Sequence, residues 1–291
     1  MLTVPTTVGT CYFKTTARRM ANDAALTEAL AREALGLVLA PLAVDADRRW
    51  MLLPDGGTRL RDVLADAPDI GHWERILPAY AVLQRRMEGR EADLRSLGVP
   101  ERTPQRLPEL LDELLDEPDW LMLDQPDGLS AADIRQLHDL RPRFVEACAE
   151  LDASGIGLSI QHDDLHDGNV VVAEGEYRVI DWGDAGVAHP FATLLVTLRS
   201  VAHAFDLGDW TPFRRGAGEL DRLRDAYLEP WSDRLPRARL EELVGLATWT
   251  GMVSRALTWR AAMPHATDEE LTESGTAIPG WLGELLASAP R

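Results

Sequence analysis

Lysine is almost absent from this sequence of 291 residues. The chain has 30 lysines and arginines in total, and Lys14 is the one lysine among them. Two explanations stay open. Position 14 is either an accident in a chain that uses arginine for nearly every cation, or a site that needs a compact ammonium group, for which a planar guanidinium is a poor replacement.

Cysteines and long apolar runs are also scarce. Cys11 and Cys148 lie far apart and do not have the spacing of a disulfide framework or a metal site. The longest nearly apolar run, residues 35–44, is about half of the roughly 20 residues that a membrane helix needs, and Pro41 interrupts it. Residues 1–10 lack the charged start and apolar stretch of a signal peptide. These absences predict a cytoplasmic protein in a reducing compartment.

Positive charge is in deficit. The chain has 48 acidic residues against 30 basic ones, which gives a formal net charge of -18. Nucleic acids and acidic membranes are polyanions and would be repelled, so we expect neither as a partner. The balance favours a neutral or cationic small molecule, although acidity that keeps the protein in solution is the simpler explanation. The sequence gives no basis for an oligomeric state.

Strands and one helix are predicted before the first dense group of turn residues. The strand signal is β-branched and aromatic content, and the helix signal is an apolar stripe at helical spacing. Turn residues fill positions 54–57, so we place a domain boundary there, between an N-terminal lobe over 1–56 and a C-terminal lobe over 57–291. The elements predicted before this boundary are a strand over 8–13, a helix over 16–34, and strands over 35–43 and 50–53.

The C-terminal lobe is predicted to be mostly helical. Ser130 is a good N-cap, and Asp133 three positions on completes an acidic variant of the capping box. Between residues 157 and 182 the pattern turns to strands. The predicted elements are a helix starting at 58, helices over 73–87, 107–116 and 130–151, strands over 158–160, 170–173 and 177–180, and helices from 190 onward.

This β segment carries the densest cluster of polar groups. If its last two strands pair as a hairpin centred near Gly175, Asn169 lies opposite Asp181. Directly opposed side chains lie about 5 Å apart. An amide oxygen and a carboxylate at that distance can share a hard cation such as Mg²⁺. The spacing alone therefore predicts Asn169 and Asp181 as metal ligands.

The loop before the hairpin contains His162, Asp164 and Asn169 in the pattern His-x-Asp-x-x-x-x-Asn. Protein kinases have this spacing in their catalytic loop, where the Asp accepts the proton of the attacking hydroxyl and the Asn binds a metal. Phosphoryl transfer needs these residue types because it depends on positioning the nucleophile and neutralising charge.

Two motifs in this region resemble those of a known family. Residues 162–169, His-Asp-Asp-Leu-His-Asp-Gly-Asn, and 179–186, Val-Ile-Asp-Trp-Gly-Asp-Ala-Gly, closely resemble the motifs of the aminoglycoside phosphotransferase and choline kinase-like family. Trp182 stands where protein kinases have phenylalanine, which separates the two groups. Residues 12–14, Tyr-Phe-Lys, look like the family's third strand with its phosphate-binding lysine, and residues 50–57 look like its hinge. The resemblance covers most of the chain.

The resemblance implies a two-lobed, protein-kinase-like α+β fold with a small mixed N-terminal lobe. It also implies Mg²⁺- and ATP-dependent phosphorylation of a hydroxyl group on a small molecule. Asp164 would be the catalytic base, Asn169 and Asp181 would hold Mg²⁺, and Lys14 would contact the α and β phosphates of ATP.

Further residues take supporting places in this resemblance. Backbone groups near Leu52 and Leu53 would hold the adenine. Asp23 occupies the place of the acidic residue that pairs with the lysine, where glutamate is usual, and Glu28 is the alternative.

Two side chains beside the motifs have supporting roles. His162 is expected to brace the loop by hydrogen bonds. Asp184 either supports the metal site or is a surface carboxylate.

The N-terminal lobe departs from the family's pattern. Thirteen residues precede Lys14, whereas the family has two further strands there, joined by a loop that covers the phosphates. Residues 1–10 would supply one strand, with Gly9 in a tight turn. Either the gene model is short or the nucleotide lobe is incomplete. The second case favours an alternative function, a non-catalytic relative that binds a nucleotide or another ligand.

A metallohydrolase is a further alternative. His162, Asp163, Asp164 and His166 have the spacing of a dinuclear metal site, to which His189 would add a ligand. The strand-loop-hairpin context fits a kinase loop better.

The acceptor class stays open, because aminoglycoside, other antibiotic, amino alcohol and sugar kinases share these motifs. Acidity and late tryptophans favour a cationic acceptor, although core packing is the more frequent role of such tryptophans. They are Trp210, Trp231, Trp249, Trp259 and Trp281.

Overall fold

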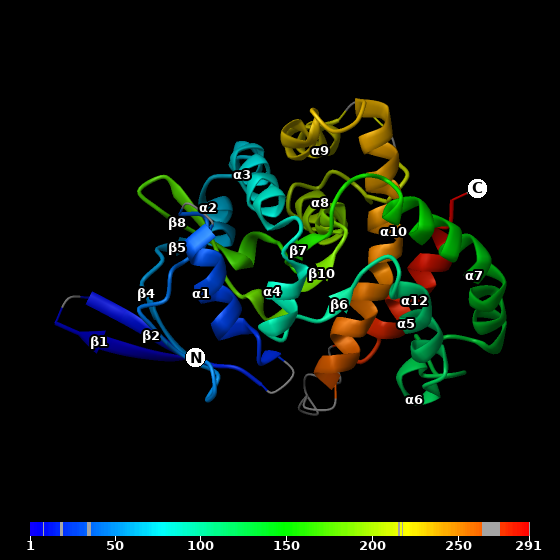
Figure 1. Ribbon diagram of the computed structural model, residues 1–291, viewed down its shortest axis with the longest axis horizontal. Helices are drawn as coiled ribbons and strands as arrows, with labels where there is room; N and C mark the ends of the chain where they lie inside the picture. Colours follow the sequence, from blue (N-terminus) through cyan, green and yellow to red (C-terminus); the bar gives the residue numbers. More distant parts are fainter. Residues whose placement is uncertain are drawn as a thin grey trace.

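A small antiparallel sheet lies at one end of the molecule, and most of the helices pack together at the other (Figure 1). The computed structural model describes residues 1–7, 9–17, 20–33, 36–214, 216, 218–263 and 274–290. This mixed architecture agrees with the predicted α+β class. Within the described residues, no helix has the length and apolarity that crossing a bilayer requires.

The small sheet places Lys14 against a helix. Its strands run in the order β1-β2-β4-β3, and every pair is antiparallel. Because side chains alternate across a strand, Tyr12 and Lys14 of β2 share a face with their partners Leu53 and Met51. Ala24 of α1 belongs to the buried cluster on this face. The bounds are β1 Leu2–Thr6, β2 Gly9–Thr15, α1 Asp23–Glu33, β3 Ala43–Asp45 and β4 Trp50–Pro54.

The first predicted strand and helix of this lobe are present. Strand β2 covers residues 9–13 of the predicted strand and includes Lys14, and its first residue, Gly9, has a φ of 126°. Helix α1 begins later than predicted, at Asp23. Residues 8, 18, 19 and 34 of these predictions lie outside the described residues.

The predicted strand over 35–43 is wrong. Residue 35 lies outside the described part, and within 36–42 the backbone makes one isolated bridge, between Val38 and Val179. Strand β3 begins only at Ala43. The apolar residues 37–39 are buried between the small sheet and the hairpin. The apolar run therefore indicates a buried segment. A continuous apolar stretch does not by itself specify a strand.

Helix α10 runs through the middle of the helical lobe, and α7 and α12 pack against it (Figure 1). Trp249 of α10 is fully buried and meets Phe144 of α7 edge-on, with ring centroids 5.6 Å apart. Ser130 and Asp133 form the predicted capping box at the start of α7. The helices are α2 Leu60–Asp66, α3 Gly71–Met87, α4 Glu91–Ser96, α5 Leu107–Leu115, α6 Pro118–Leu121, α7 Ala131–Asp152, α8 Leu194–Ala204, α9 Glu219–Leu228, α10 Arg237–Ala262 and α12 Ala277–Ala287.

Short strands within this lobe form the predicted hairpin. Strands β8 and β9 are joined by a two-residue turn, Glu174-Gly175, in which both φ angles are positive, at 55° and 81°. Val179 of β9 donates its N–H to the carbonyl of Leu37 at 2.7 Å. This bond fixes the end of the hairpin to the N-terminal lobe. The strands are β5 Thr58–Arg59, β6 Glu101–Arg102, β7 Ser159–Gln161, β8 Val170–Ala173, β9 Glu176–Val179 and β10 Gly186–Ala188.

The chain changes sheets close to the predicted domain boundary. It leaves the small sheet after Pro54, and β5 then pairs with β8 of the hairpin. The division into lobes over 1–56 and 57–291 stays a prediction at this position.

Candidate active site

His162 holds the start of the polar loop from the protein interior. Its Nε2 lies 2.9 Å from the carbonyl oxygen of Ile180, so this nitrogen carries the proton and donates it. Its Nδ1 accepts the backbone N–H of Asp164 at 3.3 Å. Burial lowers the pKa of His162, in agreement with a neutral ring. These bonds agree with the predicted bracing of the loop.

Asp163 has a left-handed backbone conformation, with a φ of 63°, that is uncommon for a residue with a side chain. Its carboxylate is anchored on both oxygens. Oδ1 accepts from Nε2 of Gln161 at 2.8 Å, and Oδ2 accepts from the hydroxyls of Ser254 at 3.2 Å and Thr258 at 2.7 Å. Since both hydroxyls belong to α10, this helix fixes the loop directly before Asp164.

Asp164 has a partner on each carboxylate oxygen. Oδ1 lies 3.1 Å from Nη2 of Arg255, and Oδ2 lies 3.4 Å from Nε2 of His166 and 3.3 Å from Nδ2 of Asn169. Burial would raise the pKa of Asp164, but the hydrogen bond to His166 and the charge of Arg255 outweigh it and lower this pKa to about 2. The Asp164 carboxylate is therefore charged at neutral pH, and its partners fix its position.

Asn169 lies at the mouth of the hairpin, one residue out of the predicted register. The two-residue turn centres the hairpin between Glu174 and Gly175, and Asn169 consequently pairs with Ile180, whose N–H donates to its carbonyl at 2.9 Å. The prediction that Asn169 lies opposite Asp181 is wrong, because it centred the hairpin on Gly175. Asp181 is the next residue along and has a left-handed φ of 64°.

Lys14 connects the small sheet to the hairpin. Its Nζ lies 2.7 Å from Oδ2 of Asp23 and 2.8 Å from Oδ1 of Asp181. Burial lowers the pKa of Lys14, but the charges of Asp181 and Asp23 outweigh this effect, and the pKa is raised. Burial raises the pKa of Asp23, against the opposing charge of Lys14. Asp23 thus reaches the lysine, whereas the alternative Glu28 pairs with Arg32 at 3.0 Å.

Leu52 and Leu53 lie inside β4, between two other strands. The carbonyl of Leu52 accepts the N–H of Leu42 at 2.7 Å, and Leu53 pairs with Tyr12 in the sheet. The backbone leaves this sheet after Pro54. The adenine-binding role of Leu52 and Leu53 stays a prediction.

Asp184 faces the same arginine as Asp164. Its Oδ2 lies 3.8 Å from Nη1 of Arg255, and 20% of its side chain is exposed. Burial raises the pKa of Asp184 to about 7; neighbouring carboxylates add to this shift, and Arg255 opposes it. Asp184 is thus part of the cluster around Asp164 and not a surface carboxylate.

The oxygen atoms at the hairpin mouth fit a magnesium ion. Nδ2 of Asn169 donates to the backbone carbonyl of Asp164 at 2.9 Å, which leaves Oδ1 of Asn169 as an acceptor. The Asp181 side chain is 48% exposed, and its carboxylate already faces a cation, the ammonium group of Lys14. Carboxylate and amide oxygens with access to water are the ligands that Mg²⁺ prefers.

A dinuclear metal site fits the same loop poorly. Both ring nitrogens of His162 and both carboxylate oxygens of Asp163 are engaged within the protein, and Nδ1 of His189 accepts the N–H of Phe191 at 3.3 Å. Across the described ranges, no three His, Cys, Asp or Glu side chains are grouped so that they would hold a metal ion.

A cavity of about 840 Å³ lies beside the partners of Asp164. His166, Arg255 and Arg61 line one part of it, and Trp210 and Trp281 line another. Two of the late tryptophans therefore belong to a cavity. Trp231 and Trp249 are fully buried in the core, as expected for this residue type.

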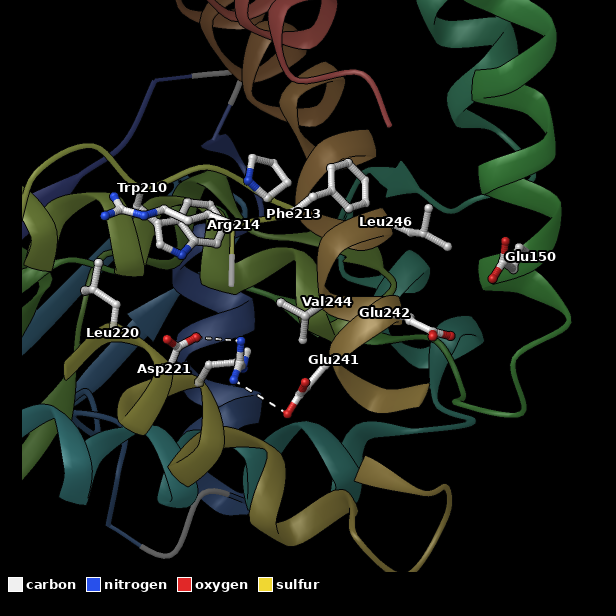
Figure 2. A pocket seen from close by; sticks show the side chains of 12 residues that line it. Glu150, Trp210, Phe213, Arg214, Leu220, Asp221, Glu241, Glu242, Val244 and Leu246 are labelled. Carbon is white, nitrogen blue, oxygen red and sulfur yellow. Dashed lines mark ion pairs between the residues drawn. The ribbon is translucent and has the colours of Figure 1, made fainter. Parts of the chain in front are cut away.

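A second cavity, of about 300 Å³, shares Trp210 with the first and is lined by residues of α9 and α10 (Figure 2). Its carboxylates Asp221 and Glu241 pair with Arg224 at 2.7 Å and 3.5 Å, as the dashed lines show. These charges are already neutralised within the protein, and no partner of Asp164 lines this cavity. The larger cavity is the better candidate for an acceptor site.

Two arginines of this region, Arg255 and Arg61, are not among the site residues predicted from the sequence. Arg255 contacts Asp164, and Nη2 of Arg61 lies 3.1 Å from Oδ1 of Asp167 and 3.3 Å from Nδ1 of His166. A signal for Arg255 was present, because it is the single charged residue between positions 243 and 259. A lone charge in an apolar helix needs a buried partner. No comparable signal marks Arg61.

Comparison with known proteins places these motifs in a family. The model of the phosphotransferase enzyme family matches residues 8–243, and no curated protein matches the chain. Choline kinase LicA from Streptococcus pneumoniae is 13% identical, with 98% of this chain and 89% of that chain covered and a TM-score of 0.62. An ethanolamine kinase from Plasmodium vivax is 14% identical, with coverages of 97% and 76% and a TM-score of 0.60. A GDP and kanamycin complex of APH(2")-IIia is 17% identical, with coverages of 95% and 86% and a TM-score of 0.56.

At these identities the structural likeness shows the fold, and it confirms the predicted two-lobed, protein-kinase-like architecture. The family match extends from residue 8 into α10, and so contains the polar loop, the hairpin and the strands β2, β3 and β4 of the small sheet. The chain belongs to the phosphotransferase enzyme family.

Proposed function

We propose that this protein transfers the γ-phosphoryl group of ATP, in a Mg²⁺-dependent reaction, to a hydroxyl group of a small molecule. The observation that carries the proposal is the convergence of two centres. Lys14, Asp23 and Asp181 meet directly after the hairpin, and Asp164, in the loop that precedes the hairpin, is held by Arg255 and Asn169. A phosphate-binding cation, metal ligands and a carboxylate for the nucleophile are the parts that phosphoryl transfer requires.

The side chains have distinct tasks in this reaction. Lys14 binds the α and β phosphates, and Asp23 keeps its ammonium group in place. Oδ1 of Asn169 and the carboxylate of Asp181 hold the metal, which neutralises phosphate charge when it is bound. Asp164 accepts a hydrogen bond from the acceptor hydroxyl and takes its proton as the oxygen–phosphorus bond forms. The bond between the γ-phosphorus and the bridging oxygen breaks, and the products are ADP and a phosphate monoester.

The larger cavity is proposed as the acceptor site, and its charges favour a cationic acceptor. Arg199 is paired with Glu284 at 2.8 Å and stacks on Trp281, with its guanidinium carbon 4.9 Å from the ring centroid. Asp206 and Asp209 also line the cavity, and neither side chain has an ion-pair partner among the described residues. Free carboxylates beside aromatic rings suit an amine or quaternary ammonium group. Solved structures of this fold include proteins named as choline and ethanolamine kinases.

The test is transfer to a panel of acceptors. Purified protein is incubated with Mg²⁺ and either ATP or GTP, and with choline, ethanolamine, an aminoglycoside or a neutral sugar. Release of the nucleoside diphosphate and formation of the phosphate monoester are followed by ³¹P NMR. We expect release that depends on an acceptor and on Mg²⁺. Asp164→Asn, which keeps the shape of the side chain, is expected to lower kcat by about 100-fold or more.

Three outcomes separate the proposal from its alternatives. Nucleotide binding without transfer to any acceptor would favour a non-catalytic relative. Hydrolysis supported by zinc in the absence of nucleotide would favour the metallohydrolase. Full activity of Asp164→Asn would contradict the role given to that carboxylate.

A further inference from the structure

Arg255 is a buried cation in an apolar stretch of α10. Its residue is 5% exposed, and the neighbouring Met252, Val253 and Ala256 are fully buried. A guanidinium in such a place is strongly destabilising unless carboxylates and carbonyls surround it. The groups that surround the guanidinium should therefore compensate its charge, and they are mainly aspartates.

These aspartates come from the two loops that the proposed reaction uses. Nη1 of Arg255 donates to the backbone carbonyl of Asp163 at 2.9 Å, and Nη2 lies 3.1 Å from Oδ1 of Asp164. Nη1 also lies 3.8 Å from Oδ2 of Asp184, in the short helical turn that begins directly after Asp181. One guanidinium group thus spans the loop of Asp164 and the loop of the metal ligand Asp181.

The planar shape of the guanidinium group explains how Arg255 fixes the orientation of the Asp164 carboxylate. Two of its nitrogens are bonded in fixed directions, one to the backbone before Asp164 and the other to the Asp164 carboxylate. The backbone at this point is left-handed, and Ser254 and Thr258 on either side of Arg255 bind the Asp163 carboxylate. The same turn of α10 therefore fixes both the peptide and the side chain. The carboxylate of Asp164 has little freedom to rotate while Arg255 is in place.

We propose that Arg255 is a positioning residue, which holds Asp164 through Oδ1 in the orientation that the acceptor hydroxyl requires and ties the Asp164 loop to the loop of Asp181. This inference rests on the proposed phosphotransferase function. Arg255 also lines the larger cavity, so the fixed carboxylate lies next to the proposed acceptor site. Displacements of about 1 Å at a reacting group are sufficient to lower rates by about 100-fold. The loss of Arg255 should lower kcat, because Arg255 is neither the phosphate-binding lysine nor a metal ligand.

The test compares Arg255→Lys, which keeps the charge, with Arg255→Met, which keeps most of the volume. A single ammonium group cannot make both bonds of the guanidinium, so we expect Arg255→Lys to lower kcat by about 10-fold or more and Arg255→Met by about 100-fold. KM for the nucleotide should stay within about twofold of wild type.

The matched control is Arg260→Lys. Arg260 is on the same helix and pairs with Glu117 in place of an aspartate of the Asp164 loop, so the Arg260→Lys variant should have the activity of wild type. Circular dichroism and thermal unfolding of each variant establish that the fold is kept. If Arg255→Met does not fold, the charged Arg255→Lys variant decides the question through the split between kcat and KM.

Crystal structures of wild type and Arg255→Lys supply a readout that does not depend on activity. We expect the Asp164 carboxylate to rotate in the variant. An unrotated carboxylate, or a kcat of Arg255→Lys within twofold of wild type, would overturn the inference. If the wild-type protein transfers phosphate to no acceptor, the proposed function fails, and the orientation of Asp164 in the two structures still decides whether Arg255 holds it.

Discussion

The two charged centres of this protein are built in opposite ways. In the Lys14 centre, composed of Lys14, Asp23 and Asp181, one cation on a flexible stem is shared by a fully buried carboxylate and by one that is 48% exposed. In the Asp164 centre, composed of Asp164, Arg255 and Asp184, a rigid guanidinium that is almost wholly buried faces two partly buried carboxylates.

In the proposed reaction, this difference would separate a centre that exchanges its partners from one that keeps them. A flexible ammonium group beside an exposed carboxylate is able to move to phosphate oxygens while the carboxylate takes a metal. A buried guanidinium with several fixed bonds keeps its neighbours in one arrangement. Substitutions in the Lys14 centre should therefore change nucleotide and metal use, and substitutions in the Asp164 centre should change the geometry of the nucleophile or the pH dependence of stability.

The largest expected effect comes from Lys14→Arg. The guanidinium keeps the positive charge but is wider and planar, so it cannot take the place of a compact ammonium between Asp23, Asp181 and phosphate oxygens. We expect kcat/KM for the nucleotide to fall by about 100- to 1,000-fold. The free energy of unfolding should change by less than about 1 kcal/mol, because the buried Asp23 keeps a cationic partner.

The reciprocal change at another position of the same lobe is the control. Arg48 pairs with Asp45 beside β3, at an exposed position, and Arg48→Lys should leave activity unchanged. Full activity of Lys14→Arg would mean that the single lysine is an accident of composition. The contrast between the two centres would then have no functional meaning.

The Lys14 centre was the more predictable of the two from sequence. Lys14, Asp23 and Asp181 each follow a local signal, namely a strand, a following helix and a hairpin, and the family pattern links them. The hairpin register was missed by one residue because loop length, and not the position of Gly175, sets the centre of the turn. The strand predicted over 35–43 failed because an apolar run does not distinguish a strand from a buried irregular segment.

The Asp164 centre was only half visible from sequence. The order of polar residues in the loop identified Asp164, but its partner Arg255 comes from a helix distant in the sequence, and tertiary packing alone brings the two together. The burial of Asp184 likewise depends on that packing. Contacts between distant segments leave no periodic signal, so the supporting residues of a site are harder to predict than the motif itself.

The second prediction concerns the pH dependence that Asp184 gives to stability. Burial raises the pKa of Asp184 to about 7 from an ordinary value of 3.8. Between these values the folded protein keeps a proton that the unfolded chain has released, so stability is lost as pH rises through this window. Asp184→Asn removes the charge, and its stability relative to wild type should increase by about 2 kcal/mol between pH 4 and pH 8, a value reduced for partial exposure.

Urea unfolding at several pH values measures this difference. Asp47→Asn, at an exposed side chain, is the control for loss of a surface carboxylate. A stability difference between Asp184→Asn and wild type that stays constant across this pH range would contradict the prediction. It would mean that folding does not raise the pKa of Asp184, and that water reaches the Asp164 centre more freely than its burial indicates.

The smallest expected effect separates two carboxylates of α1, Asp23 and Glu28. Asp23→Asn keeps the shape of the side chain but leaves Lys14 paired with Asp181 alone, so the lysine and a bound metal ion compete for the same carboxylate. We expect kcat/KM for the nucleotide to fall by about tenfold, which corresponds to about 1.4 kcal/mol. Glu28→Gln is the matched control, since Glu28 pairs with Arg32, and it should have wild-type activity. Equal losses of kcat/KM in both variants would show that the negative charge of α1, and not the ion pair with Asp23, matters to Lys14. A loss of kcat/KM in Asp23→Asn alone assigns the effect to the 2.7 Å pair between Lys14 and Asp23.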